Sequence, residues 1–390
     1  MFKIRGSIGE IGDDSAGGDF AYMTTWQVTN NGNGFPITLD GSNSPFVGYK
    51  EAQIASPDLR WATVLKKDIG IDYAFLGGMF AGSFDWFQDY RKDIFIFGTD
   101  RSVPDYYGAA KTPDINKGEI KNTGFELEIR FNKVLNNGMR FWANTNYTFA
   151  RNEIKLKDDP ALIPAYRKAQ GYAQGQYRSY IDNGYIKTYD ELYSAPASQS
   201  NDSQVLIGDH YIVDFNGDGV IDVTNDQAPY GYTGNPEHTY NATIGWEWKG
   251  FSCFAQLYGV TGVTRDVTLT SFPDQLLTVY DTGAWWNPAT GTGEVVVPRF
   301  NTQAAPANNG TQFLFDGSYF RLKNVEVAYT WTKGWIKRIG FSSLKVYLNG
   351  NNLFLITKMP DDRESNYGWS GSGGAYPTVR RYNLGFKLYL

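Results

Sequence analysis

The chain has little of what enzymes and zinc proteins usually need. Among its 390 residues there is one cysteine, Cys253, and there are two histidines, His210 and His238. A single cysteine excludes an intrachain disulfide, and so small a set of Cys and His excludes a zinc cluster. Both histidines lie in loop-like sequence, so a Ser-His-Asp triad is not expected either. We therefore predict that the chain is not an enzyme.

Long apolar runs and basic blocks are also missing. Without about 18 consecutive apolar residues, no transmembrane helix is expected. The first residues, MFKIRGSIGEIGDDSAGG, lack the apolar centre and cleavage site of a signal peptide. A net charge of -5 without a basic patch argues against nucleic acid as a partner.

Aromatic residues and glycine are abundant instead. Aromatics make up 16% of a chain whose mean hydropathy is only -0.42, and there are 43 glycines. Frequent turn residues between short periodic segments are typical of all-β proteins. Because no low-complexity linker divides the chain, we expect one sheet system.

Apolar and polar residues alternate with a period of two, which places them on opposite faces of strands. In TYNATIGWEW, Ile244 and Trp246 share one face, whereas Thr243 and Glu247 share the other. About ten to twelve antiparallel strands are predicted. They lie near residues 2–9, 63–76, 79–97, 119–131, 139–154, 238–249, 251–262, 319–332, 343–355 and 379–390, with one or two more near 175–190.

The strand lengths and connections favour a membrane over a soluble sandwich. Several segments reach about ten residues, the length of a tilted membrane-spanning strand, and carry aromatics near their ends. Very short turns are expected at 77–78 and 249–250, whereas 99–117, 156–237 and 263–318 have the composition of long polar loops. Short turns at one end and long loops at the other are typical of outer-membrane barrels.

One loop carries the sequence DFNGDGVID, which matches the spacing of a calcium-binding loop. Oxygen ligands are expected in order along it, from Asp214, Asn216, Asp218, the Val220 carbonyl and Asp222. The twelfth position holds Asn225 instead of glutamate, and the nearest carboxylate, Asp226, comes one residue late. A structural Ca²⁺ site and a metal-free turn rich in Asp, Asn and Gly both remain open.

Successive segments of the chain resemble the SusC/RagA branch of TonB-dependent outer-membrane receptors. The segments that carry the resemblance are 56–96, 116–129, 213–226, 230–259, 318–331, 344–354 and the closing YPTVRRYNLGFKLYL. The resemblance implies a 22-stranded transmembrane β-barrel in the outer membrane of a Gram-negative bacterium, with short periplasmic turns and long extracellular loops. We expect residues 1–390 to be the C-terminal part of that barrel, without the plug domain, TonB box or signal peptide.

The resemblance also implies function and partners. Such receptors import oligosaccharides or peptides, driven by the TonB complex, and pair with a SusD-like surface lipoprotein. No cofactor is required. Four loop aromatics, Trp285, Trp286, Tyr230 and Tyr232, are candidates for contact with substrate or with that lipoprotein, although packing within their own loop remains an alternative.

An alternative function is a soluble, secreted carbohydrate-binding β-protein with a calcium-stabilised loop. The two functions differ in where the apolar strand faces lie. Burial against a second sheet would indicate the binding protein, whereas an outward apolar band about 25 Å tall would indicate the barrel in contact with outer-membrane lipid. The alternation predicts that Ile244 and Val327 face lipid, and that Thr243 and Glu326 face the lumen.

Overall fold

The computed structural model describes residues 1–14, 21–29, 48–103, 112–199, 202–266, 310–332, 334–359 and 378–390. Its main feature is one ten-stranded antiparallel sheet in which each strand pairs with the next strand of the sheet along the chain. In sheet order the strands are β1 (Phe2–Asp13), β4 (Ala62–Phe75), β5 (Phe80–Ile96), β6 (Ile115–Val134), β7 (Arg140–Leu156), β14 (His238–Trp248), β15 (Phe251–Thr261), β18 (Tyr319–Trp331), β19 (Ser343–Thr357) and β20 (Arg381–Tyr389). All ten firmly predicted strands are confirmed, with ends that differ by a few residues.

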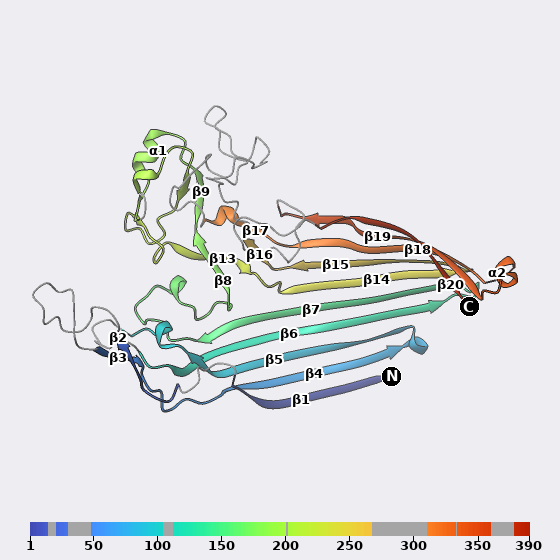
Figure 1. Ribbon diagram of the computed structural model, residues 1–390, viewed down its shortest axis with the longest axis horizontal. Coiled ribbons are helices and arrows are strands. Elements are labelled where there is room, and N and C mark those ends of the chain that lie inside the picture. The colour runs from blue at the N-terminus through green and yellow to red at the C-terminus, as the bar shows by residue number, and fades with distance from the viewer. Residues whose placement is uncertain are drawn as a thin grey trace, which may run out of the picture.

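The connections between these strands fall into two classes. At one end of the sheet lie the tight turn Leu76–Gly78 (η1), the turns at 135–139 and 249–250, and the connection that carries α2 (Trp335–Arg338). The long connections gather at the opposite end, and both chain ends lie with the short turns (Figure 1). Lys249 and Gly250 both have positive φ, 47° and 92°, as a two-residue type I′ hairpin turn requires. The predicted asymmetry is confirmed.

The pairing register extends the alternation of each strand into rows across the sheet. One row joins residues of six neighbouring strands: Ile4, Ile71, Phe84, Leu127, Tyr147 and Tyr240. Apolar side chains of this face are unusually exposed: Ile244 is 51% exposed and Val327 is 49% exposed. Thr243 and Glu326 lie on the opposite face, as the alternation predicts. An uncovered apolar face of this kind agrees with the barrel and not with a soluble sandwich.

The strands predicted near 175–190 exist but do not join the main sheet. β8 (Gln176–Tyr180) pairs with β13 (Gln227–Thr233), and β9 (Asp182–Tyr185) pairs with β11 (His210–Ile212). β8 has five residues and β9 has four. The backbone hydrogen bonds of such short strands are made by a partner strand within the same long connection. The prediction that they extend the membrane sheet was wrong.

Other small elements also lie in the long connections. They are β2 (Thr25–Thr29), β3 (Gly48–Gln53), η2 (Gly98–Asp100), η4 (Ala165–Arg167), α1 (Tyr189–Ser194), β10 (Ala197–Ser198), η5 (Asp202–Gln204), β12 (Val220–Ile221), β16 (Thr264–Asp266), η6 (Thr311–Phe313) and β17 (Leu314–Asp316). Tyr180, Ile212 and Ile221 form a small buried cluster within the connection at 157–237. Among the described residues, no helix is both long and apolar enough to cross a bilayer.

Candidate functional site

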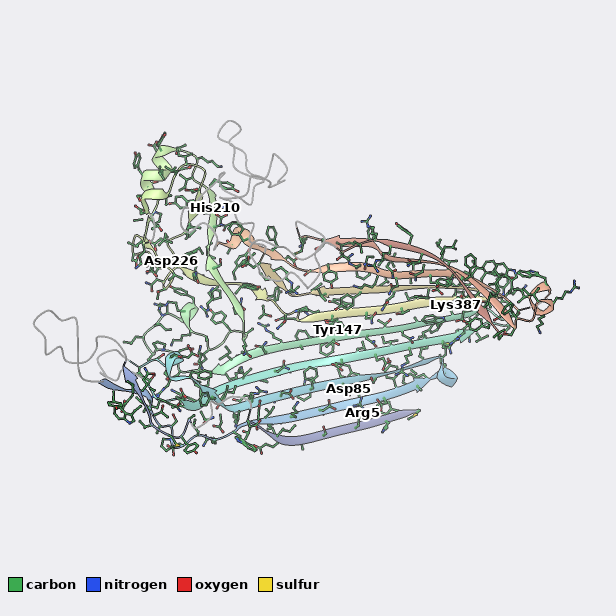
Figure 2. All side chains as sticks on the ribbon, viewed as in Figure 1. Arg5, Asp85, Tyr147, His210, Asp226 and Lys387 are labelled. Carbon is green, nitrogen blue, oxygen red and sulfur yellow. The ribbon has the colours of Figure 1, made fainter. Side chains whose placement is uncertain are left out.

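The face of the sheet opposite the apolar one is polar, and near β1 it is ionic. The Nη2 atom of Arg5 donates to Asp85 at 2.7 Å, and its Nε atom donates to Asp72 at 3.3 Å. Figure 2 shows Arg5 and Asp85 at this edge of the sheet. Gly70 lies opposite Arg5, and a Cβ there would lie 2.7 Å from the guanidinium carbon. The glycine therefore leaves the space in which the guanidinium reaches β5.

Further along the sheet, the same face carries neutral amides. Asn324 donates to Gln256 at 2.6 Å, and Asn351 donates to Asn324, so a chain of side-chain hydrogen bonds crosses β15, β18 and β19. Lys345 lies 2.7 Å from Glu326 on the same face. A surface of ion pairs and amides suits a water-filled lumen.

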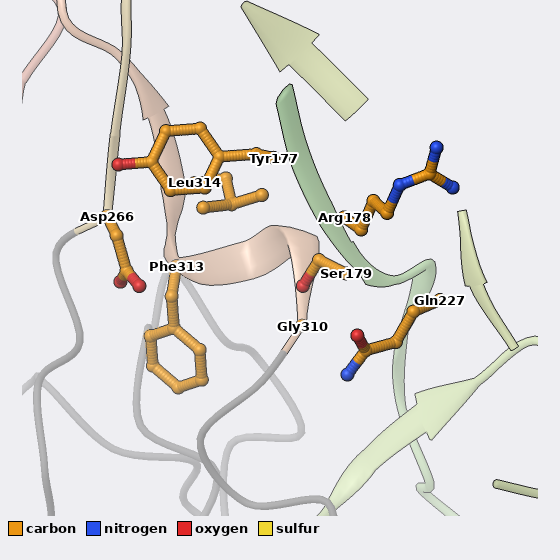
Figure 3. A pocket seen from close by; sticks show the side chains of 8 residues that line it. All are labelled: Tyr177, Arg178, Ser179, Gln227, Asp266, Gly310, Phe313 and Leu314. Carbon is orange, nitrogen blue, oxygen red and sulfur yellow. The ribbon is translucent and has the colours of Figure 1, made fainter. Parts of the chain in front are cut away.

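A cavity of about 180 Å³ lies among the long connections, beyond the sheet (Figure 3). Tyr177 and Ser179 of β8, Gln227 of β13 and Asp266 of β16 contribute polar groups to its lining, and Phe313 contributes an aromatic ring. Burial, and then the charge of Asp266, raise the pKa of Tyr177, so its phenol stays protonated and can donate a hydrogen bond. The cavity can thus offer hydroxyl, amide and carboxylate groups to a small polar molecule.

Arg178 also lines this cavity, but its charge is used by the loop itself. Its guanidinium donates to the carbonyls of Tyr166 and Lys168, and lies 5.1 Å from the centre of the Tyr172 ring. In Figure 3 it points away from the other lining side chains. Burial lowers the pKa of Arg178, as expected for a cation surrounded by backbone. Arg178 therefore holds the connection at 157–237 together and does not supply a cation to a ligand.

Contacts beside the cavity join two long connections. His210 Nδ1 lies 2.9 Å from Asp182, and the His210 ring lies 4.7 Å from that of Tyr185. The Asp182 backbone N–H donates to the Thr311 hydroxyl at 3.0 Å. Segments 177–227 and 310–314 are thereby fixed against each other. No sequence motif indicates this arrangement, because its residues come from distant parts of the chain.

The candidate calcium ligands lie in one loop, and the carboxylates among them accept backbone hydrogen bonds. Asp214 accepts from the N–H groups of Gly217 and Gly219, both at 2.6 Å. Asp226 is completely buried, and its two oxygens accept from Phe215 and Asp222 at 2.8 Å, which closes the loop across its ends.

The carboxylates of this loop accept hydrogen bonds from its own backbone. Within the described part of the chain, no group of three or more His, Cys, Asp or Glu side chains is arranged to hold a metal ion. The arrangement is that of a hydrogen-bonded turn in which the late carboxylate, Asp226, acts as a clasp. Ca²⁺ binding by Asp214, Asn216, Asp218, Val220, Asp222 and Asp226 stays a prediction.

Two of the four candidate contact aromatics lie in the described part of the chain. Tyr230 and Tyr232 lie on β13 with 41% and 49% of their surfaces exposed, and neither lines the cavity. Gln176 donates to the Tyr230 carbonyl at 2.9 Å, which holds the strand and leaves the ring open. Trp285 and Trp286 lie outside the described residues. Contact of these four aromatics with substrate or a partner remains a prediction.

Comparison with known proteins agrees with this geometry. The family described as "TonB dependent receptor-like, beta-barrel" matches residues 2–353. TonB-dependent receptor P3 of Formosa agariphila is 26% identical over 362 residues, which cover 86% of this chain and 35% of that protein. TonB-dependent receptor SusC of Bacteroides thetaiotaomicron is 22% identical over 396 residues, covering 99% of this chain and 37% of SusC.

A solved structure shows the same fold. The RagAB peptide importer in its open-open state superposes with a TM-score of 0.67 at 18% identity, and the match covers 100% of this chain and 40% of that one. The chain thus spans little more than a third of the length of these curated relatives. Because the family match extends over most of its residues, the chain belongs to the TonB-dependent receptor-like β-barrel family, and it is an outer-membrane protein of a Gram-negative bacterium and not an enzyme.

Proposed function

We propose that the chain forms part of the barrel wall of a TonB-dependent importer that takes up an oligosaccharide or a peptide. The observation that carries the proposal is the separation of the two faces of one continuous sheet, apolar outside and polar inside. Long connections gather at one end of that sheet, where a solute would first meet the protein (Figure 1). The similar fold of RagAB, a peptide importer, supports the peptide class.

The apolar outer face has the height that the proposed barrel needs. On β14 its apolar outward residues begin at Tyr240 and end at Trp248. At about 3.3 Å per residue and a tilt of about 40°, these eight steps span about 20 Å along the membrane normal, close to the apolar band of outer-membrane barrels. Side chains at the two ends extend the band further.

Closure of the barrel requires strands beyond the ten of this sheet. β1 and β20 are the two edges, and each pairs with one neighbour in it. An unpaired edge exposes backbone N–H and C=O groups that lipid cannot satisfy. We propose that residues 1–390 are the C-terminal part of the barrel domain, and that the plug and TonB box belong to other parts of the receptor. In this proposal a SusD-like lipoprotein covers the long-connection end.

Uptake by living cells tests the importer. A strain deleted for the gene would be compared with the same strain carrying the full-length gene, each supplied with one radiolabelled oligosaccharide or peptide at a time. We expect accumulation of at least one nutrient to fall more than tenfold on deletion, and to fall equally when TonB is removed or a protonophore is added. Uptake that needs the gene but neither TonB nor the proton gradient would overturn the energy-coupled mechanism.

Two substitutions test whether the cavity takes part in uptake. Ser179→Trp would fill the cavity, and Ser83→Trp would place the same side chain on the lumen face near the short turns. If the cavity contacts the nutrient, Ser179→Trp reduces uptake more than Ser83→Trp at equal receptor abundance. Equal uptake by the two variants would remove the cavity from the pathway while leaving the importer intact.

A further inference from the structure

Three strands of the sheet continue well past the apolar band at the long-connection end. β5, β6 and β7 contain 17, 20 and 17 residues, whereas β14 and β15 contain 11 each. On β6 the outward apolar residues end at Phe125, and the next two outward positions are Thr123 and Lys121. The outer face of these strands therefore changes character where it leaves the hydrocarbon.

The pairing register shows which side chains point outward there. The outward row that joins Ile69, Trp86, Phe125 and Phe149 is the last row that is apolar across β4 to β7. One outward step further, the row contains Ile8 on β1, followed by Lys67, Gln88, Thr123 and Arg151. The row after it places Lys121 opposite Tyr90. Lys92, opposite Thr63, follows on β5. The pairing of β4 with β5 is regular through Lys92, and the pairings of β5 with β6 and of β6 with β7 are regular at Lys121 and Arg151, so these cations share the outward face.

We call Lys67, Lys92, Lys121 and Arg151 the cationic ledge. Arg151 lies 3.4 Å from Glu237, yet its side chain remains 68% exposed. Lys92 rests over the Tyr90 ring, with its ammonium 5.2 Å from the ring centre. Both side chains therefore keep their charged ends open to a further anion.

Acids share this face with the ledge. Glu153, opposite Lys121 in the register, pairs with Lys155. Glu119, two positions beyond Lys121 on β6, accepts a hydrogen bond from the Tyr90 phenol and keeps its negative charge. Glu10 of β1 lies in the row of Lys121, three strands away. Among the described residues, none of these carboxylates forms an ion pair with Lys121, so its ammonium can bind a further anion.

The strands of the sheet beyond β7 end near the last apolar row and do not reach the height of the ledge. The row of Phe125 and Phe149 continues to His238 and Thr261, which are the ends of β14 and β15. On β19 the outward residue Ile356 lies one outward row inside it, opposite Phe320, and the strand ends at Thr357. The cations are therefore concentrated in the part of the sheet whose strands continue past this row.

We propose that the cationic ledge binds the phosphorylated headgroup of a lipid in the outer leaflet. Lys67 and Arg151 lie two residues, and Lys121 four residues, beyond the last apolar row. With about 3.3 Å per residue and a tilt of about 40°, these positions stand roughly 5–10 Å above the hydrocarbon, which is the depth of lipid headgroups. Basic side chains at this depth attract anionic headgroups.

The spacing of the ledge suits one multiply charged headgroup. Neighbouring strands lie about 4.8 Å apart, so the Cα atoms of Lys121 and Arg151 are separated by roughly 8 Å and those of Lys67 and Lys121 by roughly 12 Å. A phosphate between such side chains would accept hydrogen bonds from more than one of them. Because the ledge faces away from the lumen, an imported nutrient is not its ligand. This inference rests on the outer-membrane location and not on the proposed import.

Lipid retention by the purified full-length receptor tests the ledge. The receptor would be stripped of lipid in detergent, placed in neutral phosphatidylcholine nanodiscs, and given either phosphorylated lipid A or the same lipid A after enzymatic removal of phosphate. We expect the wild-type protein to retain at least fivefold more of the phosphorylated form, as counted by native mass spectrometry. Equal retention of the two forms by the wild-type protein would overturn the proposal without the need for any variant.

A matched pair of variants localises the binding. Lys67→Gln with Lys121→Gln removes two charges from the ledge, and Lys133→Gln with Lys249→Gln removes two at the short-turn end. Retention of phosphorylated lipid A is expected to fall at least threefold in the first variant and to stay within 1.5-fold of wild type in the second. Equal losses in both, measured on receptor that migrates as folded barrel in unheated gels, would reject the ledge as the site. Nutrient uptake provides a separate readout, so failure here leaves the import proposal standing.

Discussion

The two parts of the sheet, β1 with β4–β7 and β14 and β15 with β18–β20, cross the same bilayer but differ at their long-connection ends. The first part is built from long strands whose outward ends are charged, and its lumen face carries ion pairs such as Arg5 with Asp85. In the second part β14 and β15 end in the last apolar row, at His238 and Thr261, and the lumen face carries the amide chain through Asn324. The comparison shows that the length of a strand beyond the bilayer and the chemistry of its outward end change together.

The physical reason lies in what surrounds each residue. Inside the hydrocarbon an outward position excludes a charge, because burial of a charge in lipid is costly. Once a strand rises into the headgroups or water, the same outward position can carry lysine at little cost. A position therefore tolerates or excludes a charge according to its height along the strand as well as its face.

The largest expected effect comes from placing one charge at two heights on the same face. Ile244→Lys lies near the middle of the apolar band and should cost about 2–4 kcal/mol of folding free energy. Thr123→Lys lies beyond the band on β6, and Thr243→Lys faces the lumen, so both should be tolerated. Urea unfolding of the full-length receptor in liposomes, with the folded fraction read from unheated gels, measures this order. Equal losses at Ile244 and Thr243 would show that the assigned faces are wrong.

A smaller effect is expected where an aromatic ring lies on a lumen-facing glycine. A Cβ at Gly385 would overlap the ring of Tyr347, so Gly385→Ala should destabilise the barrel by about 1–3 kcal/mol. Combining it with Tyr347→Ala removes the overlap, and the double variant should lose less than the sum of the two single variants. In the other part of the sheet, Gly70→Ala should cost less, because the Arg5 and Asp85 side chains that it meets can shift.

The unfolding midpoint of the same receptor measures each of these glycine variants. Strict additivity of Gly385→Ala and Tyr347→Ala would mean that the ring does not rest on the glycine.

The two kinds of lumen network should respond differently to salt. Asp85→Asn leaves Arg5 with Asp72 and should lower the unfolding free energy in low salt, and lower it less at about 1 M NaCl, because partly exposed ion pairs are screened. Asn324→Ala breaks two amide hydrogen bonds and should cost about 1–2 kcal/mol at either salt concentration. Unfolding free energies at the two salt concentrations separate these cases. An Asn324→Ala cost that fell with salt as steeply as that of Asp85→Asn would erase the distinction between the networks.

The smallest expected effect is the response to acid of the ion pairs that Asp158 makes with Lys117 and Arg101. We call these contacts, at the start of a long connection, the Asp158 anchor. The hydrogen bond from Lys117, followed by that from Arg101, holds the pKa of Asp158 below its usual value of 3.8. Because the folded pKa is the lower one, the anchor contributes fully at pH values well above 3.8 and is lost as pH falls through the folded pKa. Hydrogen exchange around Ser102 should therefore increase between about pH 5 and pH 3.

Asp158→Asn provides the control for this response. Hydrogen exchange around Ser102 should be faster in this variant than in wild type at about pH 5. It should change little more on acidification, because the asparagine has no proton to gain. An equally strong acid response in wild type and variant would assign the effect to other carboxylates.

Much of the membrane sheet was predictable from sequence because strand periodicity and tight turns are local. The alternation in TYNATIGWEW places Ile244 outward whatever its neighbours are, and the pair Lys249-Gly250 provides the positive φ values that a two-residue hairpin needs. The apolar face then limits the register, since a shift by one residue would turn every apolar side chain inward.

The long connections could not be predicted in the same way. Residues 176–185 have the local pattern of strands, but their partners lie elsewhere in the long connection, so the pattern alone wrongly assigns them to the membrane sheet. The cavity draws its lining from Tyr177 to Leu314, and no spacing within one segment indicates it. Asp226, a late candidate metal ligand in the sequence, is buried and accepts two backbone hydrogen bonds that close its own loop, which the local sequence does not indicate.

By itself, then, the sequence determined the ten membrane strands, their inward and outward faces and the end at which the turns are short, because each follows from contacts between residues close along the chain. Only the tertiary structure decided how the long connections fold on one another, which side chains surround the cavity and where the cationic ledge stands above the apolar band. Those features depend on pairing between strands and loops that are distant in sequence, where many arrangements have similar local energies and only the sum of the long-range contacts selects one.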